Sequence, residues 1–385
     1  MAALLALSVT AFCFVTTETV PVGLLSEISG DLTISPSQVG LLVTGYAVTV
    51  VVVTLPLVRL LARVPRRPLI LGLMVLMVVS TGLSAAAQDF GTLLAARAAT
   101  ALSQAVFWGV VAPVAAGMFP AHVRGRVMAV VFTGGSIGPM VGVPAGTWLA
   151  QIAGWRSVFA ALSVLGLIAF VTLAAALRVG AAHEDHADLG TTPDVRRYVL
   201  VLATNTLAVA GFFAVFTYTS EFIVVVAAMP AALLGPLLLA RGVADFGGIA
   251  VGGIASDRNQ FLATVVPAAL LVVTLVGMYG LGASPVAAGA GIVLTGLAMG
   301  ALTPAIQNRV MEFAPGGTDL ASAGSSVAYN VGIALGSSLG GLSLSQFGTR
   351  SIAVTGAVLA AAALLAAIAT GATVREPAVA AKEAV

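Results

Sequence analysis

The chain has 385 residues, of which 59% are hydrophobic and 8% are charged, and its formal net charge is +2. Soluble globular proteins carry about 25% charged residues, so these side chains cannot cover a surface that faces water. The composition excludes a soluble enzyme, a nucleic-acid-binding protein and a disordered protein. Long apolar runs without strand-like alternation, such as 69–87 and 158–177, predict an all-α membrane protein rather than a membrane β-barrel.

Twelve transmembrane helices are expected, because one span needs about 20 apolar residues and about 32 with its loop. In chain order they are predicted over residues 4–27, 38–62, 68–87, 91–117, 126–151, 157–178, 198–222, 231–255, 260–281, 285–311, 320–345 and 351–373. We expect the first helix to be retained, because no basic residues precede it and its apolar run is too long for a signal peptide.

The polar, charged segment 179–197 divides these helices into six and six. This plan predicts two six-helix bundles related by pseudo-two-fold symmetry, which is typical of secondary transporters. The predicted domains are an N-terminal bundle over 1–178, a cytoplasmic linker over 179–197 and a C-terminal bundle over 198–385.

Arginine residues are concentrated in the connections on one side of the predicted membrane, whereas the opposite connections hold only Arg156 and Arg350. The positive-inside rule places the arginine-rich side in the cytoplasm, together with both termini. Abundant alanine, and arginine in large excess over lysine, are typical of a GC-rich bacterial genome, so a bacterial cytoplasmic (inner) membrane is expected.

Charged side chains inside the membrane are costly and are therefore functional candidates. Glu18 in the first helix and Arg97 in the fourth lie at similar predicted depth, where they can face one cavity or form a static ion pair. In the eighth helix, the i,i+4 spacing of Arg241 and Asp245 allows them to neutralise each other or to form a second ionic switch.

Uncharged polar and aromatic side chains supply further candidates for substrate contact. An aromatic pair beside an amide in the fourth helix can form a substrate wall, although such pairs are also typical of packing. Asparagines in the seventh and eleventh helices can bind substrate or a neighbouring helix. With the charged pair above, the substrate-binding candidates are Glu18, Arg97, Gln104, Phe107, Trp108, Asn205, Tyr218 and Asn330.

The fifth predicted helix carries small residues and prolines at spacings that favour a tight, bent helix contact. Its structural candidates are Gly134, Gly138, Pro139 and Gly142, and a similar glycine run in the eleventh helix suits an interface that rocks between the halves. Cys13 is the single cysteine and the histidines fall in polar connections, so neither a metal site nor a cofactor is expected. The phosphate-binding pattern GxxxxGK[ST] is absent, which argues against ATP-driven transport.

Three segments resemble motifs of the major facilitator superfamily, specifically its 12-helix drug:proton antiporter branch. GGSIGPMVGVPAG (134–146) resembles the antiporter motif of helix 5. LLAARAATALSQAVFWG (93–109) resembles the helix 4 motif, whose arginine would be Arg97. GGIASDR (252–258) resembles a cytoplasmic motif, here with Gly253, Asp257 and Arg258.

Two further segments refine the resemblance. VRLLARVPRRPL (58–69), the first-half copy of the cytoplasmic motif, keeps the arginines but lacks the expected glycine and aspartate. TTETVPVGLLSEIS (16–29), with AVFWG (105–109), is most similar to the sugar, arabinose and purine-nucleoside efflux members.

The resemblance implies the major facilitator fold and a proton-coupled exporter that works by alternating access. Its substrates would be small polar or amphipathic molecules, with sugars, nucleosides and drugs such as chloramphenicol all open. Because no histidine falls in a predicted helix, a carboxylate would carry the proton, with Glu18 as first choice and Asp245 as second.

The main alternative is a proton-coupled uptake symporter or a facilitator of the same fold. A channel would need a continuous polar lining, and a membrane enzyme would need clustered catalytic groups, so neither is favoured by so few polar residues. The expected partners are the substrate, protons and the lipid bilayer, not nucleic acid, and the protein is expected to be a monomer.

Overall fold

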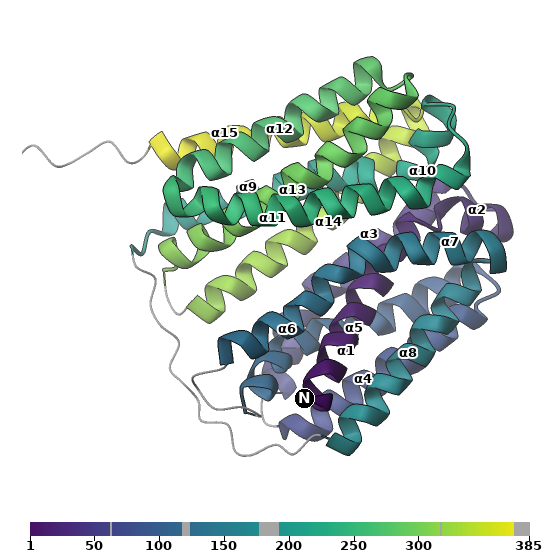
Figure 1. Ribbon diagram of the computed structural model, residues 1–385, viewed down its shortest axis with the longest axis vertical. Helices are drawn as coiled ribbons and strands as arrows, with labels where there is room; N and C mark the ends of the chain where they lie inside the picture. The colour runs from purple at the N-terminus through teal and green to yellow at the C-terminus, as the bar shows by residue number, and fades with distance from the viewer. Residues whose placement is uncertain (62–63, 118–123, 177–191, 316–317, 373–385) are drawn as a thin grey trace, which may run out of the picture.

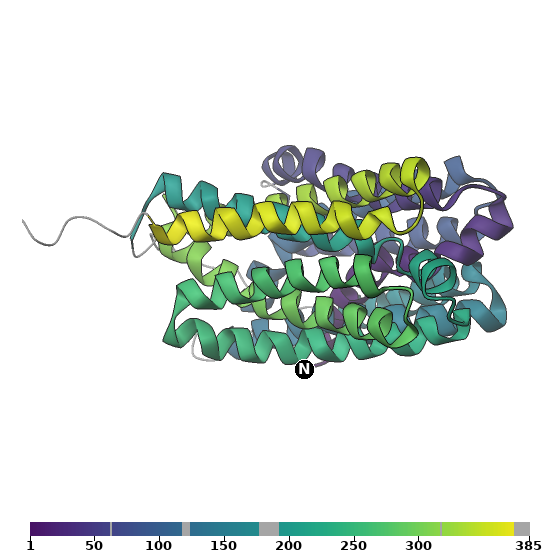
Figure 2. The same cartoon turned by 90° about the horizontal axis from the view of Figure 1, so that it is seen from above.

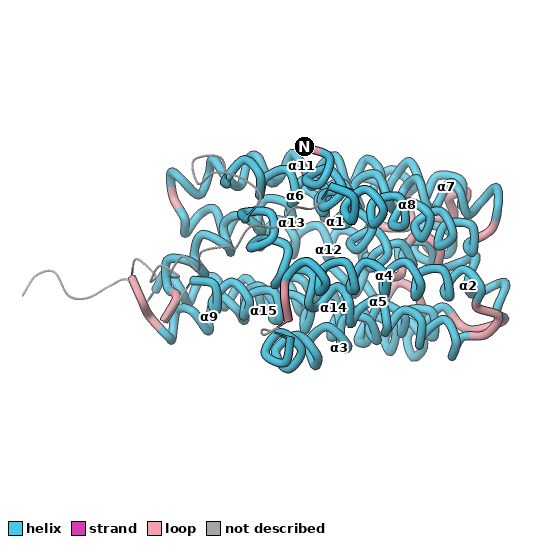
Figure 3. Tube along the Cα trace, turned by 90° about the horizontal axis from the view of Figure 1, so that it is seen from below, coloured by secondary structure: helices cyan, strands magenta, loops and turns pink. Residues whose placement is uncertain are grey.

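The computed structural model describes residues 1–61, 64–117, 124–176, 192–315 and 318–372, which form helices joined by short connections (Figures 1 and 3). The N-half comprises α1 (Ala2–Thr19), α2 (Leu25–Leu32), α3 (Pro36–Leu61), α4 (Arg66–Ala86), α5 (Phe90–Gly117), α6 (Arg124–Ile137), α7 (Val143–Ala153) and α8 (Trp155–Ala176). The C-half comprises α9 (Val195–Phe216), α10 (Thr219–Glu221), α11 (Leu234–Arg258), α12 (Gln260–Leu281), α13 (Pro285–Phe313), α14 (Thr318–Phe347) and α15 (Ser351–Ala372). The predicted all-α fold is confirmed.

Within these ranges, ten helical stretches are long and apolar enough to cross a bilayer. Most of their ends lie within a few residues of the predicted spans, because the lipid-facing apolar runs are set by local composition. The long helix α5, and the stack of α6, a π-helical segment (Gly138–Gly142) and α7, occupy the places of the fourth and fifth predicted helices.

The helices of the two halves lie on opposite sides of the molecule (Figure 1). Viewed from the C-half side, the helices of that half run side by side along one common direction (Figure 2). The halves meet near α2, α7 and α10 and diverge towards the other end, where α6 begins (Figure 1). Most of the linker predicted over 179–197 lies outside the described residues, so the domain boundary stays a prediction.

Hydrogen bonds between the halves occur at the end where they meet, which we call the closed end. Ser37 Oγ donates to the Gly341 carbonyl at 3.0 Å, and the hydroxyls of Thr44 and Ser337 are 2.7 Å apart. Both contacts join the beginning of α3 to the last part of α14. The structure therefore holds the halves together at one end and leaves them apart at the other.

At the closed end, an ion pair fastens α2 to α8. Arg156 Nη1 donates to Asp31 Oδ2 at 2.6 Å, and the indole Nε1 of Trp155 donates to the same oxygen at 3.2 Å. These two hydrogen bonds lower the pKa of the Asp31 carboxyl below its ordinary value. The exposed pair therefore positions α2 more than it stabilises the fold.

The first predicted helix ends earlier than expected. α1 stops at Thr19, a 3₁₀ turn covers Val20–Val22, and α2 starts at Leu25. Pro21 has no N–H, so it cannot donate to the carbonyl four residues before it, and the α-helical ladder ends there. The prediction of one helix over 4–27 was wrong for this reason.

The fifth predicted helix is interrupted by the π-helical segment Gly138–Gly142, which contains Pro139. A proline removes one backbone donor, and at the end of this π turn the Val143 N–H donates to the Gly138 carbonyl five residues before it. The predicted bend of this helix stays a prediction.

Most glycines of the two runs pack within a half, and the expectation of a rocking interface stays a prediction. A Cβ on Gly134 would meet the backbone of Ser8 in α1. Likewise, a Cβ on Gly336 would meet the backbone of Ala210 in α9. In the second run, Gly341 also lies beside Ser37 of the other half. The runs therefore tighten each half.

Candidate functional site

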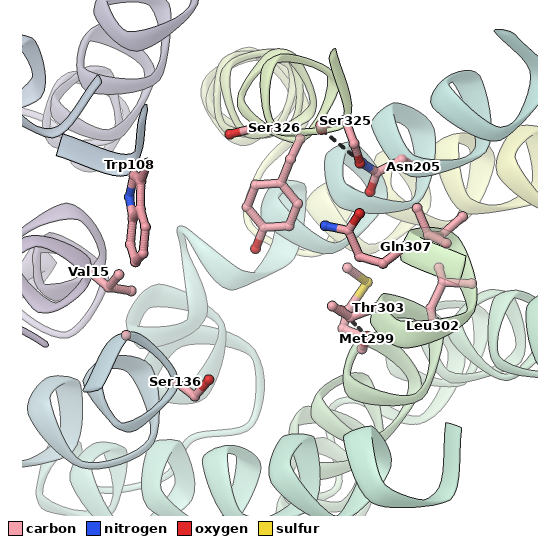
Figure 4. Close-up of a pocket in the computed structure, with 13 residues that line it drawn as sticks. Val15, Trp108, Ser136, Asn205, Met299, Leu302, Thr303, Gln307, Ser325 and Ser326 are labelled. Atoms are coloured by element: carbon pink, nitrogen blue, oxygen red, sulfur yellow. Dashed lines mark hydrogen bonds between the residues drawn. The ribbon is translucent and has the colours of Figure 1, made fainter. Parts of the chain in front are cut away.

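A cavity of about 370 Å³ lies between the halves (Figure 4). On the N-half side, Figure 4 shows Val15 and Trp108 facing across it towards Asn205 and Gln307 of the C-half. The lining consists of Val15, Trp108, Gly135, Ser136, Asn205, Met299, Leu302, Thr303, Ile306, Gln307, Ser325, Ser326 and Tyr329. Among these described residues none carries a formal charge at neutral pH, so the wall offers rings, hydroxyls and amides.

Two predicted contact residues, Trp108 and Asn205, line this cavity, and their role in substrate binding stays a prediction. The Asn205 amide donates to the Ser325 carbonyl at 3.2 Å, which joins α9 to α14 beside the cavity. Tyr329 and Gln307 were missed by the sequence analysis. A polar side chain inside a long apolar helix is the signal that could have found them.

The Glu18 carboxylate is held by an amide. Gln104 Nε2 donates to Glu18 Oε2 at 2.7 Å, and the Tyr46 hydroxyl donates to Gln104 Oε1 at 2.6 Å. Tyr46 and Gln104 are 1% and 3% exposed, whereas Glu18 keeps partial exposure. The three side chains come from α3, α5 and α1 and form one hydrogen-bonded chain.

Arg97 does not pair with that carboxylate. Its guanidinium, 0% exposed, donates to the backbone carbonyls of Thr17 at 2.8 Å and of Glu18 at 3.1 Å. In a continuous helix the Thr17 carbonyl would accept from residue 21, but Pro21 has no N–H, so this oxygen is free for Arg97. The guanidinium also lies 5.1 Å from the centre of the Tyr46 ring. Arg97 therefore caps the end of α1.

The acid lies one helical turn from the cavity wall. Glu18 follows Val15 by three residues on α1, and Gln104 precedes Trp108 by four on α5. Residues at these spacings share a helix face and are separated by about 5 Å along the axis. Because both steps lead towards the closed end, the Glu18–Gln104 pair sits just beyond the cavity on that side.

The second predicted pair is arranged differently. Arg241 lies over the rings of Phe212 and Phe216, at 4.9 and 4.4 Å from their centres, and its Nε has no hydrogen-bond partner. In the described part of the chain, Arg241 and Asp245 form no ion pair within 4.0 Å. The guanidinium is in cation–π contact with α9, and both predicted roles of the Arg241–Asp245 pair stay predictions.

The remaining substrate candidates lie away from the cavity wall. Phe107 is buried against Phe14, with ring centres 4.8 Å apart. Tyr218 donates to the Ser337 carbonyl at 2.8 Å, at the closed end. The Asn330 amide donates to Ser326 in its own helix at 3.0 Å. None of these three residues lines the cavity, and a role in substrate binding stays a prediction for each.

The segment that resembles the cytoplasmic motif, 252–258, forms the last two turns of α11. Gly252 packs against the backbone of Ala301 in α13, whereas Gly253 has open space at its Cβ position. Asp257 and Arg258 are exposed at the end of the helix. Neither residue lines the cavity, and their structural role stays a prediction. In the part of the chain that the structure describes, no group of three or more histidine, cysteine or acidic residues could hold a metal ion.

Two bundles of membrane-length helices around a central, uncharged cavity define a multi-pass membrane protein of the secondary-transporter type. The sequence profile of the Major Facilitator Superfamily matches residues 7–319. The chain belongs to this superfamily, and it is therefore a membrane transporter.

Relatives cover almost the whole chain. "Uncharacterized MFS-type transporter YtbD" of Bacillus subtilis (strain 168) is 34% identical over 377 residues, which are 94% of this chain and 93% of that protein. "Probable sugar efflux transporter" of Mannheimia succiniciproducens is 30% identical over 365 residues, covering 92% and 90%. "Inner membrane transport protein YdhP" of Escherichia coli (strain K12) is 32% identical over 372 residues, covering 94% of each.

Solved structures agree in fold. A bacterial homologue of the human lysosomal transporter Spinster, in an inward-facing and unoccupied conformation, superposes with a TM-score of 0.76 over 98% of each chain. The sequences are 17% identical, so this similarity concerns the fold alone.

Proposed function

We propose that this transporter exports small, uncharged polar or amphipathic molecules in exchange for protons, by alternating access. The observation that carries the proposal is Glu18, a partly exposed residue one turn from the cavity whose carboxylate is held by an amide instead of a cation. An intramembrane acid without a bound cation is suited to take up and release a proton. Asp245 in α11 is the second candidate for this role.

The cavity supports the substrate class. A ring such as that of Trp108 offers a flat apolar face, while Gln307 and the hydroxyls of α14 offer hydrogen bonds. A charged solute that enters the cavity would lose its hydration and meet no opposite charge on the wall, which costs free energy. Sugars, nucleosides and amphenicol drugs such as chloramphenicol are uncharged and combine apolar faces with hydrogen-bonding groups.

The helix 5 motif and the name of the relative from Mannheimia favour export. An uptake symporter or facilitator of the same fold is the alternative. The two differ in how substrate accumulation in everted membrane vesicles responds to an imposed pH gradient: an antiporter loads the vesicles when their interior is acidic.

The test begins with an overexpressing strain, screened for resistance to sugar analogues, nucleosides and chloramphenicol. The compound that it exports is then used in everted vesicles with the Glu18→Gln variant, which keeps the size of the side chain but cannot release a proton. We expect binding of the compound to persist, and both accumulation against a gradient and substrate-induced proton movement to be lost.

The matched control is Glu221→Gln, the same change in α10, which should leave proton coupling intact. Uphill export by Glu18→Gln at the native rate would remove Glu18 from the mechanism. Asp245→Asn would then be examined in the same assay.

We also propose that the protein resides in the bacterial inner membrane with both termini in the cytoplasm. The arginine-rich connections support this orientation. Reporter fusions after Gly180 and after Arg375 should both report the cytoplasm, and a periplasmic signal at either would overturn the topology.

A further inference from the structure

Gln104 can face Glu18 in two ways, because its amide offers a carbonyl oxygen on one side and N–H donors on the other. An ionised Glu18 only accepts hydrogen bonds, so it requires the N–H side. The Tyr46 hydroxyl donates to Gln104 Oε1 at 2.6 Å, and this contact turns Nε2 towards Glu18. Tyr46 therefore selects the orientation of Gln104 that suits the charged carboxylate.

The Tyr46 ring is itself fixed. It is 1% exposed, packs against Ala101 and Ala105 of α5, and lies beneath the Arg97 guanidinium. Arg97 in turn holds the backbone carbonyl of Glu18. The contacts form a closed ring from Glu18 through Gln104, Tyr46 and Arg97 back to Glu18, so none of these side chains can turn without breaking a buried contact.

We infer that Tyr46 and Gln104 are positioning residues that set the proton affinity of Glu18. The inference rests on the proposed function, in which Glu18 exchanges the coupled proton. When a water-borne proton binds the carboxylate, its oxygen becomes an O–H donor, and Gln104 can accept from it through Oε1 only after its amide turns. That turn breaks the hydrogen bond from the Tyr46 hydroxyl to Oε1 and leaves this hydroxyl to accept from Nε2, so the contact with Tyr46 favours the ionised carboxylate. The titratable groups facing Glu18 are Arg97 from α5, Tyr46 from α3 and Tyr329 from α14.

Because Gln104 lies one turn from Trp108 on α5, the same amide links the acid to the cavity wall. A substrate that presses on Trp108 acts on the helix that carries Gln104. The ring of contacts thus offers a short physical connection between the cavity and the proton site.

The test is an infrared titration of the purified full chain in liposomes, without substrate. The carbonyl band of a protonated carboxyl that is absent from Glu18→Gln reports Glu18. Gln104→Leu removes a hydrogen bond to the charged Glu18 carboxylate. We therefore expect the midpoint of the Glu18 titration to move up by about one pH unit, a tenfold change in proton affinity. Tyr46→Phe keeps the ring and should move the midpoint in the same direction by less.

The matched control is Tyr198→Phe, which deletes a tyrosine hydroxyl that donates to the Ala321 carbonyl at 3.0 Å in the C-half. Its midpoint should equal that of the native protein. An unchanged midpoint in both Tyr46→Phe and Gln104→Leu would overturn the inference, while loss of uphill export in Glu18→Gln would leave the proposed function standing. The reverse pattern, shifted midpoints with unimpaired export by Glu18→Gln, would reject Glu18 as the coupling site and retain the positioning roles.

Discussion

At the scale of single residues, Arg97 illustrates how a backbone defect determines what a buried cation does. The carbonyl of Thr17 lacks its helical donor because Pro21 follows four residues later. The planar guanidinium reaches both this oxygen and the carbonyl of Glu18, at 2.8 and 3.1 Å. The fork of donors, and not only the positive charge, is what the end of α1 requires.

Arg97→Lys should therefore resemble Arg97→Ala in stability. The lysine keeps the charge but has one nitrogen in place of the planar fork whose Nη1 and Nη2 reach the two carbonyls, so we expect at least one buried acceptor to be left unsatisfied, at a cost of about 2 kcal/mol. Thermal and denaturant unfolding of the purified variants in detergent measure this loss. Native stability of Arg97→Lys would mean that charge alone suffices and that the carbonyl contacts are incidental.

At the scale of elements, neighbouring glycines of one motif have opposite surroundings. Gly252 faces α13, where a Cβ would meet the backbone of Ala301, and backbone atoms cannot move aside as a flexible side chain can. Gly253, the next residue on α11, has no heavy atom within 4 Å of its Cβ position. The α11–α13 contact thus depends on one glycine of the pair.

Gly252→Ala should destabilise the C-half by about 1–3 kcal/mol through overpacking. Gly253→Ala is the matched control and should leave stability unchanged or raise it by about 0.5–1 kcal/mol, since alanine restricts the unfolded chain and favours helix. Melting temperatures of both variants in the same detergent provide the comparison. Equal losses in the two variants would contradict the close packing of Gly252 against α13.

At the scale of the whole molecule, the closed end is joined by small side chains of α3 and α14. Thr44 and Ser337 place their hydroxyls 2.7 Å apart across the two halves, and the buried Tyr218 lies between Gly40 and Gly341. Alternating access requires these contacts to separate in the opposite state. These contacts involve short serine and threonine side chains and the Tyr218 ring, so separating α3 from α14 breaks few hydrogen bonds.

Cysteines at Thr44 and Ser337, in a chain whose buried Cys13 is replaced by alanine, should form a disulfide on oxidation. The cross-link should stop transport, and a reductant should restore it, because the closed end can no longer open. Each single-cysteine variant is the control and should transport under both conditions. Undiminished transport by the cross-linked protein would show that the halves need not separate there.

The amino-acid sequence alone determined that the protein lies in a lipid bilayer, which segments form helices and where most of these helices end. Composition and the length of apolar runs are local properties, and a bilayer imposes nearly the same rule on every span. For the same reason, the intramembrane candidates Glu18, Arg97 and Asp245 could be recognised without a structure.

The tertiary structure decided which partners these residues have. A helix turns by about 100° per residue, so a small difference in rotation or depth decides whether a side chain meets a carboxylate, a carbonyl or a ring. Arg97 meets backbone carbonyls, Arg241 meets two phenylalanine rings, and Glu18 meets Gln104. Such contacts join segments far apart in the chain, and they form only when α1, α3 and α5, or α9 and α11, are packed together.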